Sequence, residues 1–314
     1  LVVEMSGKEI GSTCSQPSVI AYMIQLADIH KGSHVLEIGT GSGYNAALLG
    51  EIVGNENVIT TDIDYSIFNT AKKNFERAGK EDIKLVNRDG SGKFPELAPY
   101  DSVIVTCATS DISWFDSLVE GGTIVMPLLT RGFEILVKLT KRGDRLIGMP
   151  ISPVSFLTFR GLDSVLADYK KNISSLANLI KKAETDDSLT ERINNLEKDE
   201  YYSFLFYLSI KSDKAIYFQS QEEELEDGYG IWSRSAPFGI TIITDKKVRH
   251  WGDKKILKEF EDIYDRWRDK KLSYKDYELI VIPHSTPEEK PQKNDIVVDK
   301  KKNTFIFRPV VNRE

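Results

Sequence analysis

Cysteine and histidine are scarce in this chain of 314 residues, which has two cysteines, Cys14 and Cys107, and four histidines. Two cysteines give neither a disulfide framework nor a zinc quartet, so a reducing cytoplasm is the compartment we expect. The histidines have no spacing typical of metal ligands, and we expect no metal site. They are His30, His34, His250 and His284.

Long apolar runs and an excess of basic charge are absent as well. No stretch of about 18 uncharged apolar residues occurs, so we expect no membrane span. Lys and Arg number 42 against 48 Asp and Glu, and the net charge of −6 argues against a protein that holds a nucleic-acid backbone. No secretory signal is visible, although the chain opens at Leu1 and an N-terminal leader stays an open possibility.

The length predicts two domains, and the density of charge changes near residue 162. Residues 1–162 hold 15 basic and 19 acidic side chains, whereas the slightly shorter remainder holds 27 and 29. We place the boundary at Gly161, which gives a first domain over residues 1–161 and a second over residues 162–314. The oligomeric state does not follow from the sequence.

The first half alternates short apolar strands with helical patterns, which predicts an α/β fold with a doubly wound, Rossmann-like sheet. Asp64 is placed to cap a helix that Gly79 ends, and Ser110 or Asp111 to cap a helix between the last two strands. Ligands of such sheets bind beyond the carboxyl ends of the strands. The expected strands are Ser33–Ile38, Asn57–Thr61, Ile83–Asn87, Tyr100–Thr106 and Gly122–Pro127.

A glycine-rich turn follows the first of these strands and opens a helix over Tyr44–Val53. Its glycines let backbone amides approach a ligand closely. A dinucleotide fingerprint requires a third glycine where Tyr44 stands, and a phosphate loop over Gly90–Phe94 lacks its earlier glycine, because Asn87 stands there. The remaining nucleotide interpretation is an S-adenosylmethionine site; an ordinary turn without a ligand is the alternative. The candidate cofactor residues here are Glu37, Gly39, Thr40, Gly41, Ser42 and Gly43.

Polar residues also close the neighbouring strands. Glu37 suits the cationic methionine end of that cofactor, and Asp62 is placed to accept both ribose hydroxyls, because a carboxylate offers two acceptor oxygens. Asp89 and Gly90 are candidates for the adenine edge, and Thr106 closes the fourth strand. Three carboxylates at successive strand ends favour a ligand site over a plain turn.

Four segments in order resemble the protein-L-isoaspartate O-methyltransferase family: Gly11–Pro17 (GSTCSQP), Val35–Leu49, Ala98–Thr109 and Gly121–Pro127. The resemblance covers about half of the chain. It implies that Ser15 lies beside the methyl-accepting carboxylate, with Thr13 and Gln16 as its neighbours in substrate binding. Local pattern alone leaves open that Ser15 only caps the helix that Pro17 starts.

The resemblance implies methylation of an aspartyl or isoaspartyl carboxylate in a peptide. Such a carboxylate is already ionised near neutral pH, so the enzyme's task is alignment and exclusion of water. Ser15 then orients the carboxylate, and the ester product closes to an aspartimide outside the enzyme. In the family a strand similar to VRFVPL lies by the peptide groove; here Ser155 and Phe156 stand in VSFLTFRG, which departs from it.

The second half predicts a smaller α+β domain. We expect helices over residues 163–197 and an amphipathic helix over Trp251–Lys270. A strand such as Phe238–Thr244 is a candidate edge for pairing with a peptide. The other expected strands are Tyr201–Ile210, Ala215–Phe218, Tyr277–Ile282 and Asn303–Arg308, and a polar loop follows from Pro283 to Asn294.

Three short features of this half look like the C-terminal extension of family members that serve ribosomal peptide natural products, chiefly lanthipeptides. They are Gly228–Gly230, Ser235–Gly239 and Trp251–Gly252. This resemblance implies that the substrate is an aspartyl residue in a cyclised precursor peptide. A repair methyltransferase with an accessory domain is the first alternative, and a non-catalytic peptide-binding scaffold the second.

Overall fold

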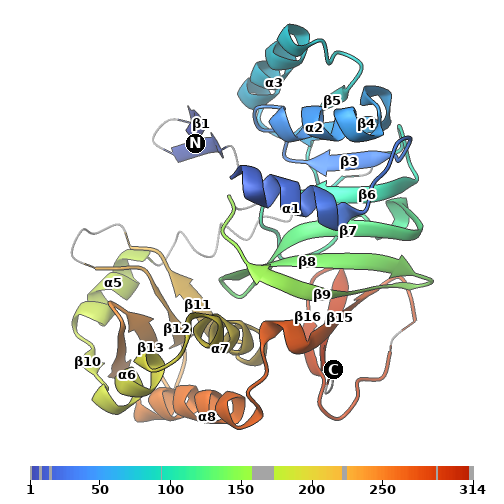
Figure 1. Ribbon diagram of the computed structural model, residues 1–314. Helices are drawn as coiled ribbons and strands as arrows, with labels where there is room; N and C mark the ends of the chain where they lie inside the picture. The colour runs from blue at the N-terminus through green and yellow to red at the C-terminus, as the bar shows by residue number, and fades with distance from the viewer. Residues whose placement is uncertain are drawn as a thin grey trace.

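The computed structural model describes residues 2–6, 9–13, 16–92, 94–157, 173–220, 225–287 and 289–310, with the backbone alone for residues 2–6, 9–13 and 173–175. Its largest element is a ten-stranded sheet that runs through the middle of the molecule (Figure 1). A two-stranded hairpin, β1 (Val2–Ser6) and β2 (Glu9–Thr13), precedes it.

One half of the main sheet is parallel. Its central strands are buried on both faces, as their nearly continuous apolar sequences require, whereas the edge strand Lys84–Asn87 is partly exposed. The strand order reverses inside this half, which is the topological switch point of the sheet. The first three parallel strands of the chain lie on one side of this point and the next two on the other. In spatial order the parallel strands are β5 (Lys84–Asn87), β4 (Val58–Asp62), β3 (Val35–Ile38), β6 (Tyr100–Val105) and β7 (Leu118–Thr130).

The other half of the main sheet is antiparallel and includes strands from the C-terminal part of the chain. β7 forms a long hairpin with the strand that follows it in the chain. The three outermost strands of this half come from residues beyond 161, the predicted domain boundary. The boundary itself lies outside the described residues, and the division into two domains stays a prediction. These strands are β8 (Phe133–Arg142), β9 (Arg145–Pro153), β15 (Tyr277–Pro283), β17 (Asn303–Pro309) and β16 (Ile296–Asp299).

Three helices cover one face of the parallel strands: α1 (Pro17–Ala27), α2 (Tyr44–Val53) and α3 (Tyr65–Ala78). The predicted cap of α3 is confirmed, because the Asp64 side chain accepts hydrogen bonds from the backbone N–H groups of Ser66 and Ile67. Gly79 ends α3 in the left-handed conformation, also as predicted. The α/β, Rossmann-like fold class is therefore confirmed.

The opposite face is covered differently from the prediction. No helix connects β6 to β7; residues 106–114 form a loop that ends in a single 3-10 turn, η2 (Phe115–Ser117). Side chains such as Trp114 fill the space, and α7 (Lys198–Lys211) packs beside them. The predicted strand Tyr201–Ile210 is wrong because its eight consecutive buried residues belong to this helix, which is enclosed on all sides and shows no amphipathic period.

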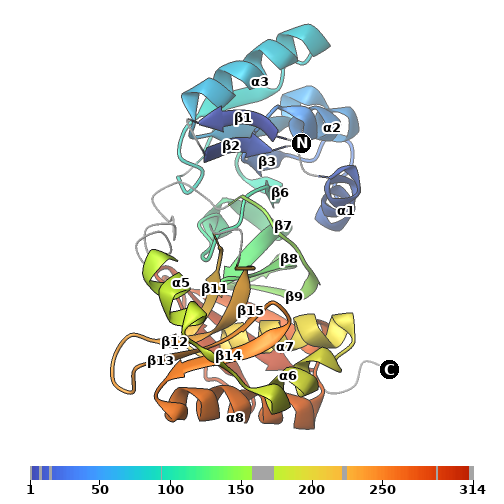
Figure 2. The same cartoon turned by 90° about the vertical axis from the view of Figure 1, so that its left-hand side faces the viewer.

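The second half contains a smaller antiparallel sheet in the order β10 (Glu184–Thr185), β14 (Lys247–Gly252), β13 (Gly239–Thr244), β12 (Gly228–Ser233), β11 (Ala215–Phe218). β13 pairs on both sides, so the prediction that Phe238–Thr244 is an edge strand is wrong. The remaining helices are α5 (Ile173–Lys181), α6 (Asp187–Asn194) and α8 (Lys254–Lys270), and α8 lies along one face of this sheet (Figure 2). Short 3-10 turns are η1 (Asn55–Asn57) and η3 (Tyr274–Asp276).

One apolar core joins the two halves. It runs from Leu36 of β3 through Phe206 of α7 to Phe260 of α8 and Phe307 of β17. The expected helix Trp251–Lys270 begins at Lys254, because Trp251 belongs to β14. Among the described helices, none is both long enough and apolar enough to cross a membrane.

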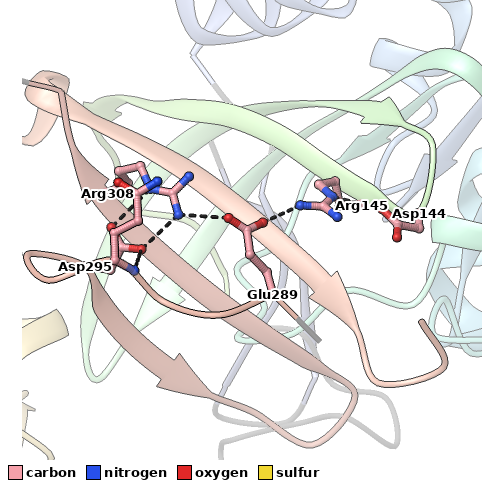
Figure 3. Close-up of polar contacts among 6 residues, drawn as sticks. Asp144, Arg145, Glu289, Asp295 and Arg308 are labelled. Carbon is pink, nitrogen blue, oxygen red and sulfur yellow. Dashed lines mark hydrogen bonds and ion pairs between the residues drawn. The ribbon is translucent and has the colours of Figure 1, made fainter. Parts of the chain in front are cut away.

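An ion-pair network holds the loop between β15 and β16 against the main sheet (Figure 3). Arg308 of β17 donates to Asp295 and Glu289, and Glu289 also accepts from Arg145 at the start of β9. The Asp295 side chain is only 1% exposed, so its charge is neutralised inside the protein. The described residues of this polar sequence, 284–287 and 289–295, therefore belong to a tethered loop.

Candidate functional site

The glycine-rich turn lies where β3 ends, between β4 and α2. The backbone N–H groups of Gly39 and Thr40 donate to the Thr61 carbonyl at 2.9 and 3.0 Å, which fixes the start of the turn against β4. Gly43 has a φ of +84°, and a Cβ there would lie 2.7 Å from the Phe75 ring. The missing Cβ of Gly43 thus leaves room for the Phe75 ring of α3 to pack against the turn.

Glu37 is completely buried beneath this turn. Its carboxylate accepts hydrogen bonds from Asn45 Nδ2 at 2.6 Å and from Thr60 Oγ1 at 2.5 Å, and Thr60 Oγ1 lies 2.7 Å from Thr40 Oγ1. Burial raises the pKa of Glu37 to about 7, while these hydrogen bonds lower it and the charge of Asp62 adds to the rise. The group therefore changes charge close to neutral pH.

Asp62 closes β4 and faces the turn. Its two carboxylate oxygens accept the backbone N–H groups of Gly41 at 3.2 Å and of Asp64 at 3.1 Å. Its carbonyl accepts from Asn87 Nδ2 at 2.8 Å, which ties β4 to β5. A carboxylate offers about four acceptor positions, and these bonds hold this one in a fixed orientation beside the glycines.

The remaining predicted cofactor residues shape the rim of the same site. Asp89 accepts from the backbone N–H and the hydroxyl of Ser91, both at 2.8 Å, and the Gly90 carbonyl accepts from the Trp114 indole at 2.8 Å. The Thr106 hydroxyl donates to the carbonyls of Ile38 and Gly39, at 3.0 and 2.7 Å. Thr106 thus fastens the turn to β6. The Ser42 carbonyl accepts from Asn74 Nδ2 of α3 at 2.9 Å.

This arrangement fits S-adenosylmethionine. Three glycines with positive φ form the turn, an oriented carboxylate closes the next strand, and a second carboxylate lies beneath the turn. Glu37 is the last residue but one of β3, Asp62 ends β4, and Asp89 follows β5; these three strands are neighbours, as the order of the βα units predicts. Of the predicted cofactor residues, Glu37 and Thr106 support the turn from below and from the side.

The predicted acceptor residues lie near the start of the chain. Ser15 falls outside the described residues, and Thr13 ends β2, where only the backbone is described. Gln16 is exposed and occupies the N-cap position of α1, with Pro17 following as the first helical residue. The Gln16 carbonyl accepts the backbone N–H groups of Val19 and Ile20, and its side chain makes no capping bond.

Ser155 and Phe156 follow β9 and lie beside the loop that leaves β6. The backbone N–H of Ala108 donates to the Leu157 carbonyl at 2.9 Å, so residues 154–157 lie against this loop. Ser155 is exposed, whereas Phe156 packs partly into the core under α1. The structure therefore places residues 154–157 at the carboxyl end of β6, the strand whose next residue, Thr106, is bonded to the glycine-rich turn.

Glu134 of β8 is a functional candidate that the sequence analysis did not find. Its Oε2 accepts the backbone N–H of Phe156 at 2.6 Å, and its carbonyl accepts that of Val154 at 3.2 Å. Burial raises the pKa of Glu134 to about 7, and the bond from Phe156 opposes the rise. In the sequence, Glu134 is recognisable only as a single carboxylate within the apolar stretch FEILV. That the Phe156 N–H is its partner is seen only in the fold.

Comparison with known proteins agrees with this geometry. The sequence model of the family Protein-L-isoaspartate(D-aspartate) O-methyltransferase matches residues 3–163. A protein-L-isoaspartate O-methyltransferase from Desulfotalea psychrophila is 38% identical over 154 residues, which are 48% of this chain and 71% of that protein. One from Thermotoga maritima is 26% identical over 286 residues, 90% of this chain and 82% of that protein. A solved structure of a protein-L-isoaspartate O-methyltransferase has a TM-score of 0.53 and 25% identity, and covers 89% of this chain and 82% of its own.

The matched region contains every described residue of the cofactor turn and of the neighbouring strand ends, as well as residues 154–157. It spans half of the chain, and the longer relative extends the likeness through the second sheet. The turn and its carboxylates are thus parts of an S-adenosylmethionine-dependent carboxyl methyltransferase, and the chain belongs to the protein-L-isoaspartate(D-aspartate) O-methyltransferase family.

Proposed function

We propose that this protein methylates the free carboxylate of L-isoaspartyl residues in polypeptides, as a repair enzyme. The observation that carries the proposal is the extent of the alignment with the Thermotoga maritima relative. This protein-L-isoaspartate O-methyltransferase aligns with 90% of this chain. The second half is therefore compatible with that activity, and it no longer argues by itself for a specialised peptide substrate.

The residues of the chain divide the task between two places. Asp62 and the turn from Gly39 to Gly43 hold S-adenosylmethionine, with Glu37 supplying negative charge beneath the turn. When bound, the cofactor supplies an electrophilic methyl group on a sulfonium. Because the acceptor carboxylate is ionised at neutral pH, the protein needs no strong base there. Its residues orient the carboxylate and exclude water, a task that we assign to Ser15 and residues 154–157.

Tailoring of a cyclised, lanthipeptide-like precursor stays a prediction without support beyond the diffuse sequence resemblance. A non-catalytic scaffold is less favoured, because Glu37 and Asp62 keep their hydrogen-bonded positions around the turn. The peptide nature of the substrate is common to the repair and tailoring hypotheses.

Mass spectrometry with two substrates tests the proposal. The first is a linear isoaspartyl peptide with the matched aspartyl peptide as its control, and the second is a ring-constrained aspartyl peptide. We expect methyl transfer to the isoaspartyl peptide only. Methylation or dehydration of the constrained peptide alone would favour tailoring, and calorimetry without detectable binding of S-adenosylmethionine would favour a scaffold.

A further inference from the structure

The second sheet has an unpaired edge at β11. This strand pairs with β12 alone among the described residues. The Trp232 N–H donates to the Lys214 carbonyl at 2.9 Å, so positions 214, 216 and 218 carry the ladder hydrogen bonds. By the alternation of an antiparallel pair, Ala215 and Tyr217 direct their N–H and C=O groups away from β12.

Tyr217 is the position where this edge offers a donor and an acceptor together. The Ala215 N–H already donates to the Ser212 carbonyl at 3.3 Å. Neither main-chain group of Tyr217 has a hydrogen-bond partner within the described part of the chain. Its side chain is 36% exposed, and its hydroxyl donates to Asp227.

This edge lies next to the methyltransferase half. Tyr217 is directly opposite Tyr229, with ring centroids 6.5 Å apart, and the Tyr229 hydroxyl donates to the Arg131 carbonyl at 2.8 Å. Tyr229 also makes an edge-to-face contact with Phe133, at 6.1 Å between centroids. The face of β11 that carries Tyr217 and Tyr229 therefore lies toward the β7–β8 hairpin.

The same hairpin also binds residues 154–157, the segment to which we assign alignment of the acceptor carboxylate. Glu134 follows Phe133 and holds the backbone of Phe156. Phe133, which contacts Tyr229, and Glu134, which binds Phe156, are adjacent residues of β8, so this strand links the Tyr217 face of β11 to residues 154–157.

We propose that β11 binds the substrate polypeptide as an added strand, through the main-chain groups of Tyr217, and so holds residues that flank the methylated one. This inference rests on the proposed function and names how its substrate is held. An isoaspartyl residue is a change of the main chain that occurs within any sequence, and main-chain pairing recognises an extended polypeptide regardless of its side chains. An edge strand is therefore the appropriate binding element for such a substrate.

The test compares Tyr217→Pro with Tyr217→Ala. Both variants lose the ring, but only proline lacks the outward N–H, and edge positions of this kind accept proline without loss of ladder bonds. Isoaspartyl peptides of about four and about twelve residues are the substrates, since about twelve extended residues span roughly 40 Å. We expect KM for the long peptide to be about tenfold higher in the proline variant than in the alanine variant, with no such difference for the short peptide.

Hydrogen exchange gives a readout that needs no variant. The long peptide should slow exchange of the Tyr217 amide in the wild-type protein, and the short peptide should not. Equal KM values for the two folded variants, or a Tyr217 amide that the long peptide leaves unprotected, would overturn the inference while the proposed function stands. Absence of methyl transfer to both peptides by the wild-type protein would overturn the proposed function, and the inference with it.

Discussion

The carboxylate of Asp111 accepts a 2.5 Å hydrogen bond from the side-chain amide of Asn303, a residue 192 positions further along the chain. Its other oxygen accepts the backbone N–H of Lys302 at 2.7 Å, and Asp111 and Asn303 are both buried. This contact fastens the loop after β6 to the turn between β16 and β17. The loop leaving the cofactor site thus depends on the last strands of the protein.

Replacement of Asp111 by alanine should lower the free energy of unfolding by about 3 kcal/mol, because three donors, the backbone N–H groups of Ile112 and Lys302 and the side-chain amide of Asn303, lose a charged acceptor. Urea denaturation measures the loss. A double-mutant cycle with Asn303→Ala should show a coupling energy of about 1 kcal/mol or more. Additive effects of the two substitutions would mean that the contact contributes nothing of its own.

The sequence predicts elements whose signals are local. Asp64 and Gly79 bound α3 because a cap and a left-handed end depend on a few neighbouring residues. Asp111 carries the same local signal, and it does accept the N–H of Ile112, yet no helix follows it. The other hydrogen bonds of its carboxylate come from Lys302 and Asn303, far along the chain, which a local pattern cannot reveal.

Burial and edges are properties of the whole fold, which explains the other differences. α7 lacks an amphipathic period because the main sheet, α8 and β16 enclose it. β13 has the sequence expected of a peptide-binding strand, but the order of the sheet makes β11 the edge. In the site, the order of the parallel strands places the predicted carboxylates together. Glu134 lies on β8 and binds Phe156, which follows the neighbouring strand β9, and this contact depends on how the two strands pair in the sheet.

The affinity for S-adenosylmethionine should depend on pH through Glu37. Its pKa is about 7, so the carboxyl group is neutral below that pH and negative above it. If the negative form binds the cationic cofactor, the affinity rises roughly tenfold from pH 6 to pH 8. Calorimetry across this range measures it, with Glu37→Gln as the variant that should bind more weakly at pH 8 and without this dependence. Parallel pH profiles for the two proteins would contradict the role of Glu37.

Ser15→Ala separates substrate alignment from cofactor binding. We expect turnover of an isoaspartyl peptide to fall by about a hundredfold, because an oriented hydrogen bond to the acceptor is lost. The affinity for S-adenosylmethionine should change little. Calorimetry and steady-state kinetics on the same preparation measure both. An equal loss of both quantities would mean that Ser15 has a structural role, such as support of α1.

Arg308→Ala should destabilise the protein strongly, because Asp295 would remain as a buried charge without its partner (Figure 3). We expect a loss of about 3 to 5 kcal/mol in urea denaturation. Asp144 belongs to the same network but its side chain is 42% exposed, so Asp144→Ala is a matched control for which we expect a much smaller loss. Similar losses in the two variants would refute the distinction between the buried and the exposed pair.

Glu134→Gln should stabilise the protein at alkaline pH. Because burial raises the pKa of Glu134 from 4.5 to about 7, the folded state binds this proton more tightly than the unfolded state. Its contribution to stability is complete below about pH 4.5 and is lost as the pH rises through 7.

Glutamine keeps an acceptor for the Phe156 N–H and carries no charge, so the gain of the variant over the wild type should grow by about 2 kcal/mol between pH 5 and pH 8. Urea denaturation at the two pH values measures it. Glu76→Gln, at an exposed position of α3, is the control and should show no such growth. If the difference in free energy of unfolding between Glu134→Gln and the wild type is the same at both pH values, the Glu134 carboxylate is ionised at pH 5 as well as at pH 8. The Phe156 N–H would then be bound by a charged carboxylate over this whole range.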